Sequence, residues 1–272
     1  MRLAKSKKNV NRILNKSFFS LEKLISIGSI SFFIFIWYII AKYNFVSPVF
    51  FPSPNKTWTA FYDLLMNGYK GNSLFYHLLD SLYRLFLAFI IAIITAVPLG
   101  LLSGYSNKVR AFLDPIIEFY RPLPPLSYYS LLILWFGIGN MSKIALLYLA
   151  AFAPIYIASM AGVKGVPIDR ILSSQSLGAN KWQVFRYIIF PSCLPEIFTG
   201  VRTAIGFAYT TLVAAEMVAA VSGIGWMVLD ASRYLRSDIM FVGIIILGLT
   251  GIILDTVIRK IEKTIVPWKG KE

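Results

Sequence analysis

Very few side chains in this sequence are suited to covalent chemistry. His77 is the only histidine and Cys193 the only cysteine among 272 residues. A Ser-His-Asp triad, an internal disulfide and a cysteine-rich zinc site are therefore not expected. The string G-x-x-x-x-G-K-[ST], which cradles nucleotide phosphates, does not occur either. We expect no catalytic residue, metal or cofactor in this chain, and we expect any nucleotide energy to come from another subunit.

Polar residues inside long apolar segments are the remaining functional candidates, because a charge there costs roughly 2.5 to 3.5 kcal/mol. Glu216 has two interpretations: it gates a pathway through hydrogen bonds, or it forms a structural pair with Arg202 or a backbone donor. Arg202 either attracts an anion or extends its guanidinium to the membrane interface. Weaker pathway candidates, with helix packing as the competing interpretation, are Thr210, Thr211 and Tyr209.

The composition indicates which elements must hold these residues. With 57% hydrophobic residues, 15% charged residues, a mean hydropathy of +0.67 and a net charge of +14, the chain is more apolar and more basic than soluble domains are. A membrane-spanning helix needs about 20 mainly apolar residues. The sequence predicts an all-α polytopic membrane protein with six spans, of which the third is short, at Leu24–Ala41, Leu82–Gly104, Leu126–Ile138, Ile144–Val163, Ile197–Ala220 and Met240–Ile258.

Lysine and arginine are shared unequally between alternate loops, with 19 on one side and 6 on the other. This asymmetry predicts that both termini are cytoplasmic. The resulting organisation is a basic tail at 1–23, a six-span domain at 24–260 and a second tail at 261–272. Because the cations flank helices rather than cluster on one domain, nucleic-acid binding is not expected. The basic leader and apolar run also suit a secretory signal, but no small-x-small exit follows, so we interpret the run as a retained span.

Two loops carry clear conformational signals. On the outer side, Ser53 is a good N-cap, Pro54 suits the first helical position and Gly68 marks a helix end, which predicts an amphipathic interfacial helix. On the inner side, the prolines of 121–125 forbid a continuous helix. That break is either part of a pathway or hinge, or a rigid connector. Asp255 precedes Arg259 by four residues, which predicts a local ion pair.

The inner loop 164–195 predicts a compact helical protrusion. Its first short helix ends at Gly178. A second helix begins at Asn180, pairs this N-cap with Gln183 in a capping-box-like arrangement, and ends at Pro191. The protrusion is too structured for a linker and too small for an enzyme domain. It suggests a docking surface for a cytoplasmic partner.

These strings resemble the permease subunits of ABC importers, and the taurine, alkanesulfonate and nitrate group in particular, with taurine permeases most similar. The stretch 175–185 followed by Phe190-Pro191 is similar to the family's EAA loop, although Leu172-Ser173-Ser174 stands where Glu-Ala-Ala would be. Other strings that resemble the family occur in the same order, at Arg121–Pro125, Leu134–Gly139, Phe152–Pro154, Ala161–Lys164, Leu194–Gly200 and Leu212–Glu216.

The resemblance implies a homodimer in the bacterial inner membrane, with two ATPase subunits on the cytoplasmic side and a substrate-binding protein on the other. It implies a transport subunit that is not itself an enzyme, and taurine or a related sulfonate as the substrate. It also implies that the residues that transmit ATPase closure to the bundle are Leu177, Gly178, Ala179, Asn180 and Lys181.

Other functions stay open from the sequence. An importer for aliphatic sulfonates or nitrate would share much of the same sequence. A proton- or sodium-driven carrier would need a relay of intramembrane carboxylates or histidines, and the spans offer little beyond Glu216. A membrane hydrolase has the least support, because no paired carboxylates or Ser-His pair lie at one predicted depth.

Overall fold

The computed structural model describes residues 24–269, and within that range the chain folds into helices without a β-sheet. The tail predicted at 1–23 lies outside the described residues. The helices are an N-terminal helix Leu24–Lys42, α2 Pro54–Asn67, α3 Leu74–Tyr105, α4 Asn107–Tyr120, α5 Pro125–Phe136, α6 Asn140–Lys164, α7 Ile168–Ser176, α8 Lys181–Val184, a π-helical turn Phe185–Ile189, α9 Phe190–Ala219, α10 Ile224–Arg233 and α11 Ser237–Ile265.

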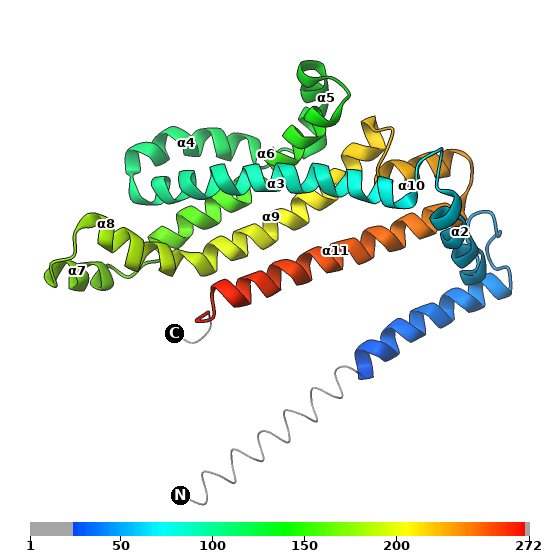
Figure 1. The fold of residues 1–272 in the computed structure, drawn as a ribbon, viewed down its shortest axis with the longest axis horizontal. Coiled ribbons are helices and arrows are strands. Elements are labelled where there is room, and N and C mark those ends of the chain that lie inside the picture. The colour runs from blue at the N-terminus through cyan, green and yellow to red at the C-terminus, as the bar shows by residue number, and fades with distance from the viewer. Residues whose placement is uncertain (1–23, 270–272) are drawn as a thin grey trace, which may run out of the picture.

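The core of the molecule is a bundle in which α3, α6, α9 and α11 run side by side along its length (Figure 1). Small residues let these helices approach closely. A Cβ atom on Gly100 of α3 would lie 2.5 Å from the Tyr156 carbonyl oxygen of α6, and one on Gly200 of α9 would overlap Ala158. Close packing of small residues is the usual way in which helices associate in lipid, where no hydrophobic force drives them together.

Five of the six predicted spans correspond to helices long and apolar enough to cross a membrane. The exception is the third, where α5 has only 12 residues, which is about 18 Å of helix against about 30 Å of hydrocarbon. The sequence already marks this segment, Leu126–Ile138, as short for a span, and α5 is one residue shorter still. The last helix is longer than predicted and continues to Ile265, into the stretch assigned to the C-terminal tail.

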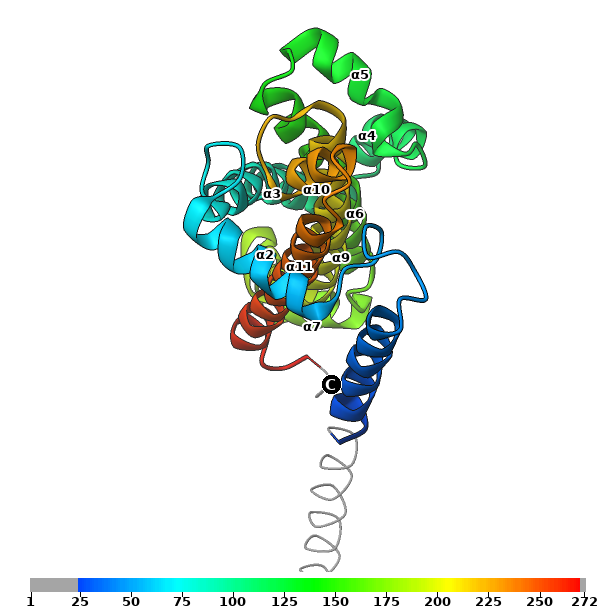
Figure 2. The same ribbon diagram turned by 90° about the vertical axis from the view of Figure 1, so that its right-hand side faces the viewer.

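The N-terminal helix stands apart from the bundle and is exposed along its length (Figures 1 and 2). Only its C-terminal part is anchored. The Trp37 indole donates a hydrogen bond to the Pro52 carbonyl oxygen at 2.9 Å, and its ring packs on Phe241 of α11 with centroids 5.6 Å apart. An apolar helix without protein neighbours needs lipid around it, which agrees with a retained span.

The bundle has two structurally different ends (Figure 1). At the α2 end, α2 and α10 cover the helices, and at the α7 end, α7 and α8 project beyond them. The predicted caps of α2 are confirmed: the Ser53 hydroxyl accepts from the Lys56 amide at 3.3 Å, and Gly68 ends the helix with φ of 73°. The C-terminus of α11 lies at the α7 end (Figure 1).

Candidate functional site

The loop at the α7 end presents an apolar tip on a sharp turn. Leu177, at the C-terminus of α7, is 89% exposed. Gly178 adopts φ of +86°, and nothing lies within 4 Å of a Cβ atom placed there. This is the left-handed region that glycine reaches without steric penalty. The Gly178 and Ala179 amides donate to Gln175 and Ser174 carbonyl oxygens at 2.9 and 3.1 Å, so the turn is ordered although little covers it.

The helix after the turn starts as the sequence predicts. The Asn180 side chain accepts from the Gln183 amide at 2.8 Å, and the Gln183 side chain accepts from the Asn180 amide at 2.8 Å. This reciprocal capping box satisfies two amides that the first turn leaves without a partner. Leu177–Lys181 therefore forms one rigid, solvent-facing unit between two helices.

The predicted end of that helix at Pro191 is wrong. The chain passes from α8 through the π-helical turn Phe185–Ile189 into α9, and Pro191 lies in the first turn of α9. The Phe190 amide bonds to the Phe185 carbonyl oxygen, five residues back, just before the proline that has no amide to offer. A π-helical turn accommodates such an interruption without ending the helix. The projecting loop is thus continuous with the longest apolar helix of the bundle.

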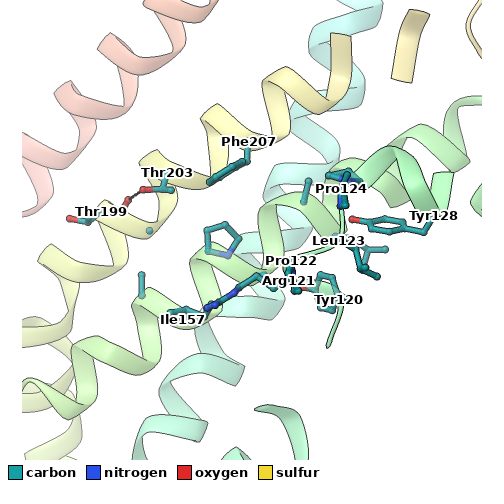
Figure 3. Close-up of a pocket in the computed structure, with 17 residues that line it drawn as sticks. Tyr120, Arg121, Pro122, Leu123, Pro124, Tyr128, Ile157, Thr199, Thr203 and Phe207 are labelled. Carbon is teal, nitrogen blue, oxygen red and sulfur yellow. Dashed lines mark hydrogen bonds between the residues drawn. The ribbon is translucent and has the colours of Figure 1, made fainter. Parts of the chain in front are cut away.

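A cavity of about 600 Å³ lies halfway along the molecule, between the proline-rich segment 121–125, α6 and α9 (Figure 3). Phe207 lies on α9, and Arg121 lies beside Ile157 of α6 (Figure 3). Most of the lining is apolar, and Arg121 is the one charged residue in it. The polar lining groups on α9 are Thr199 and Thr203. The structure therefore places the broken backbone against a cavity, where such a break is tolerated at membrane depth.

The predicted pathway residues do not line this cavity. Two of them face α11 instead: Arg202 lies 3.8 Å from the Glu262 carboxylate, and the Tyr209 hydroxyl donates to the Leu247 carbonyl oxygen at 2.7 Å. Thr211 is buried, and the exposed Thr210 donates back to carbonyl oxygens of its own helix. Thr199, Thr203 and Phe207, which do line the cavity, were not singled out from the sequence.

Glu216 belongs to a buried polar cluster toward the α2 end. Its carboxylate is fully buried and accepts from the Ser81 hydroxyl at 2.7 Å, from Arg84 at 2.8 Å and from the Gly225 amide at 2.9 Å. The expected pairing with Arg202 is wrong, and the expected backbone donor is confirmed. A rise of 1.5 Å per residue puts Arg202 roughly 21 Å from Glu216 along the same helix, too far to pair.

Arg84 is the centre of this cluster, and no sequence pattern singled it out. Its guanidinium is 2% exposed and also bonds to Asp80, to Asn140 at 2.8 Å and to Ser222. These groups come from α3, α6, α9 and the connection to α10, so one cation ties four elements together. A buried ion pair is stable only when further hydrogen bonds satisfy its remaining atoms, as they do here.

A second cluster of polar side chains holds the hairpin between α2 and α3 against α10. The Tyr69 hydroxyl donates to Asp230 at 2.8 Å, and Lys70 lies 3.5 Å from the same carboxylate. Burial, followed by the hydrogen bond to Asp230, raises the pKa of the Tyr69 phenol above its ordinary value. Both contacts cross 160 residues of sequence or more, so no local pattern predicts them. The local Asp255–Arg259 pair, by contrast, is predicted and present at 2.6 Å.

Comparison with known proteins gives consistent matches. A family model described as binding-protein-dependent transport system inner membrane component matches residues 96–266. The taurine transport system permease protein TauC of Escherichia coli is 40% identical over 253 residues, which cover 93% of this chain and 92% of the relative. The putative aliphatic sulfonates transport permease protein SsuC of Bacillus subtilis is 34% identical, covering 86% and 84%.

Two further matches extend the comparison. The nitrate import permease protein NrtB of Synechocystis is 32% identical, covering 81% of this chain and 82% of the relative. Among solved structures, a chain of the MetNI methionine ABC transporter in an inward-facing conformation matches with a TM-score of 0.60 and 17% identity, covering 68% of this chain and 93% of that chain. At that identity the structural match shows the fold alone.

Proposed function

The chain belongs to the binding-protein-dependent transport system inner membrane components, the permease subunits of ABC importers, and on this premise we propose that it carries taurine or a related sulfonate across the membrane. As a permease it is a transport subunit rather than an enzyme. Its family implies an ATPase and a substrate-binding protein as partners. The observation that carries the proposal is the ordered, exposed turn Leu177–Lys181, a surface with no evident role within the subunit itself.

Coupling to the ATPase proceeds through this turn. Leu177 presents an apolar side chain to a groove on the ATPase, while Gly178 allows close approach, Ala179 packs back on the bundle core and Asn180 fixes the following helix. Because α8, the π-helical turn and α9 are continuous, a push on the turn moves α9, whose Thr199, Thr203 and Phe207 face the cavity. A packed bundle responds to such a push by switching between discrete arrangements rather than by bending.

The complete importer comprises two copies of this chain, two ATPase subunits and one binding protein, with the α7 end and both termini in the cytoplasm of a bacterial cell. The excess of lysine and arginine in the loops of that end supports this orientation. The exposed apolar faces of α5, including Leu134 and Trp135, support burial against a second copy.

Taurine and the related sulfonates share a negatively charged sulfonate group, and the cavity suits that group. Arg121 supplies a permanently charged fork that matches the geometry of a sulfonate, in a lining that is otherwise uncharged and mostly apolar. The 40% identity to a taurine permease favours taurine within this class. Identities of 34% and 32% to sulfonate and nitrate permeases make those anions the alternative substrates. An ion-coupled carrier is less well supported, because Glu216 is already held by three hydrogen-bond donors.

Uptake by the reconstituted complex tests the proposal. Proteoliposomes with permease, ATPase and binding protein should accumulate labelled taurine only with ATP, and an excess of a short alkanesulfonate should compete better than nitrate does. Uptake of nitrate in preference to taurine would contradict the substrate assignment. Uptake that persists without the ATPase would contradict the importer assignment and favour an ion-coupled carrier.

A further inference from the structure

A second hollow, separate from the central cavity, opens on the side of the molecule at the α7 end. This groove has a volume of about 680 Å³ and lies between the last turns of α3 and the segment that joins α8 to α9. Its wall is almost entirely apolar. The residues that line it are Val97, Pro98, Leu101, Leu102, Tyr105, Lys181, Trp182, Phe185, Arg186 and Phe190.

The sequence around the groove indicates its depth in the membrane. The apolar run of α3 ends at Tyr105, and the next residues include Lys108 and Arg110. Tyr105 is exposed, and Trp182 is 67% exposed and stacks on Phe185 with ring centroids 5.8 Å apart. Exposed tyrosine and tryptophan at the end of an apolar helix mark the boundary between hydrocarbon and headgroups. The apolar wall therefore faces acyl chains, and the mouth faces headgroups.

The mouth of the groove is cationic. Lys181 and Arg186 line it, and both are exposed. Across residues 24–269, neither forms an ion pair with a carboxylate. On the neighbouring helix α4, Asp114 is engaged with Arg110 and with the Tyr156 hydroxyl. An apolar slot with two uncompensated cations at headgroup depth is complementary in charge and shape to an anionic phospholipid.

We propose that this groove is a binding site for an anionic phospholipid of the leaflet at the α7 end. One acyl chain lies along Val97, Leu101 and Leu102, and the phosphate lies between Lys181 and Arg186. This goes beyond the proposed function, because it depends on membrane insertion and not on the substrate. The bound lipid would brace the π-helical turn against α3, and it would thereby make coupling depend on membrane composition.

Photolabelling tests this site in the assembled complex of permease and ATPase. The complex is placed in nanodiscs of phosphatidylcholine that carry a trace of phosphatidylglycerol with a diazirine on one acyl chain. After irradiation, labelled peptides are mapped by mass spectrometry. Peptides from 97–105 and 181–190 should carry the label. The double variant Lys181→Gln with Arg186→Gln should label roughly tenfold less, whereas a matched pair on exposed α11 cations, Lys260→Gln with Lys263→Gln, should label as the wild type does.

A second variant tests the contribution of the apolar slot separately from that of the two cations. Leu102→Trp fills the slot at an exposed position and keeps both cations, so it should reduce labelling in a complex that elutes and melts normally. A control probe, phosphatidylcholine with the same diazirine on one acyl chain, should label the wild type and the double variant equally weakly. Equal labelling of all variants by phosphatidylglycerol would overturn the proposal. Absence of label from the groove in the assembled complex would also overturn it, and would assign the groove to the ATPase interface. Nanodiscs carry the same lipids in both leaflets, so neither outcome depends on the orientation or on taurine.

Discussion

The two ends of this bundle hold their polar and exposed groups in opposite ways. Toward the α2 end, Arg84 and Glu216 are buried and the carboxylate accepts three hydrogen bonds from the chain itself. At the α7 end, Leu177 and Gly178 are ordered by local hydrogen bonds but are left uncovered by the rest of residues 24–269. The difference indicates that one end is fixed by its own contacts, while the other is completed by a partner. Substitutions at the two ends should therefore affect different measurements.

The largest effect on stability should come from Arg84→Met. It leaves the Glu216 carboxylate buried without its cation, which costs about 3 to 5 kcal/mol. Thermal unfolding of the purified permease in detergent measures the loss. The exposed Arg259→Gln, which removes a surface partner of Asp255, should change stability by less than about 0.5 kcal/mol. If the two variants melt together, the buried cluster does not fix this end.

Gly223→Ala should have the next largest effect. Gly223 adopts φ of +113°, and a Cβ atom there would overlap the Glu216 carboxylate. We expect a loss of about 3 kcal/mol from backbone strain and overpacking combined. Gly137→Ala is the matched control, since Gly137 also has positive φ but open space around it, and should lose only about 1 kcal/mol. Equal melting temperatures would show that the carboxylate moves aside freely.

Asn180→Ala should have a smaller effect, and it acts on the α7 end. It removes the side chain that caps α8 and frees the Gln183 amide, which costs about 1 kcal/mol. Because the cap orders the turn, ATP-dependent uptake should fall more than the melting temperature does. Asn180→Asp keeps the cap and should restore uptake. If Asn180→Ala and Asn180→Asp give the same uptake, the cap has no part in the coupling mechanism.

Local patterns in the sequence predicted the elements that local physics determines. Three of these elements depend only on neighbouring residues, and each is present. They are the caps of α2, the turn at Gly178, and the capping box at Asn180 and Gln183. Hydropathy located the long helices but not all of their ends, since α11 continues past the predicted Ile258 to Ile265. Pro125 opens a helix too short to span, and Pro191 fails to end one because a π-helical turn precedes it.

The contacts between helices distant in sequence could not be predicted in the same way. Glu216 pairs with Arg84 across 132 residues, and Tyr69 reaches Asp230 across 161. Two observations could have directed attention to Arg84. Asp80 and Arg84 are four residues apart on one face of α3, and the distance along α9 excludes Arg202 as the partner of Glu216. The cavity residues Thr199, Thr203 and Phe207 recur at a spacing of four, which marks a face of α9 but does not say what it faces.

The most direct test of the account compares two glycines at opposite ends of the molecule. Gly178 and Gly71 both have positive φ, at +86° and +83°, and neither has a neighbour within 4 Å of a Cβ position. Replacing either by aspartate should lower stability by a similar amount, about 1 kcal/mol. Binding of the ATPase to the purified permease is then measured by titration. The account predicts that Gly178→Asp weakens this binding at least about tenfold while Gly71→Asp binds as the wild type does, and equal affinities of the two variants would contradict it.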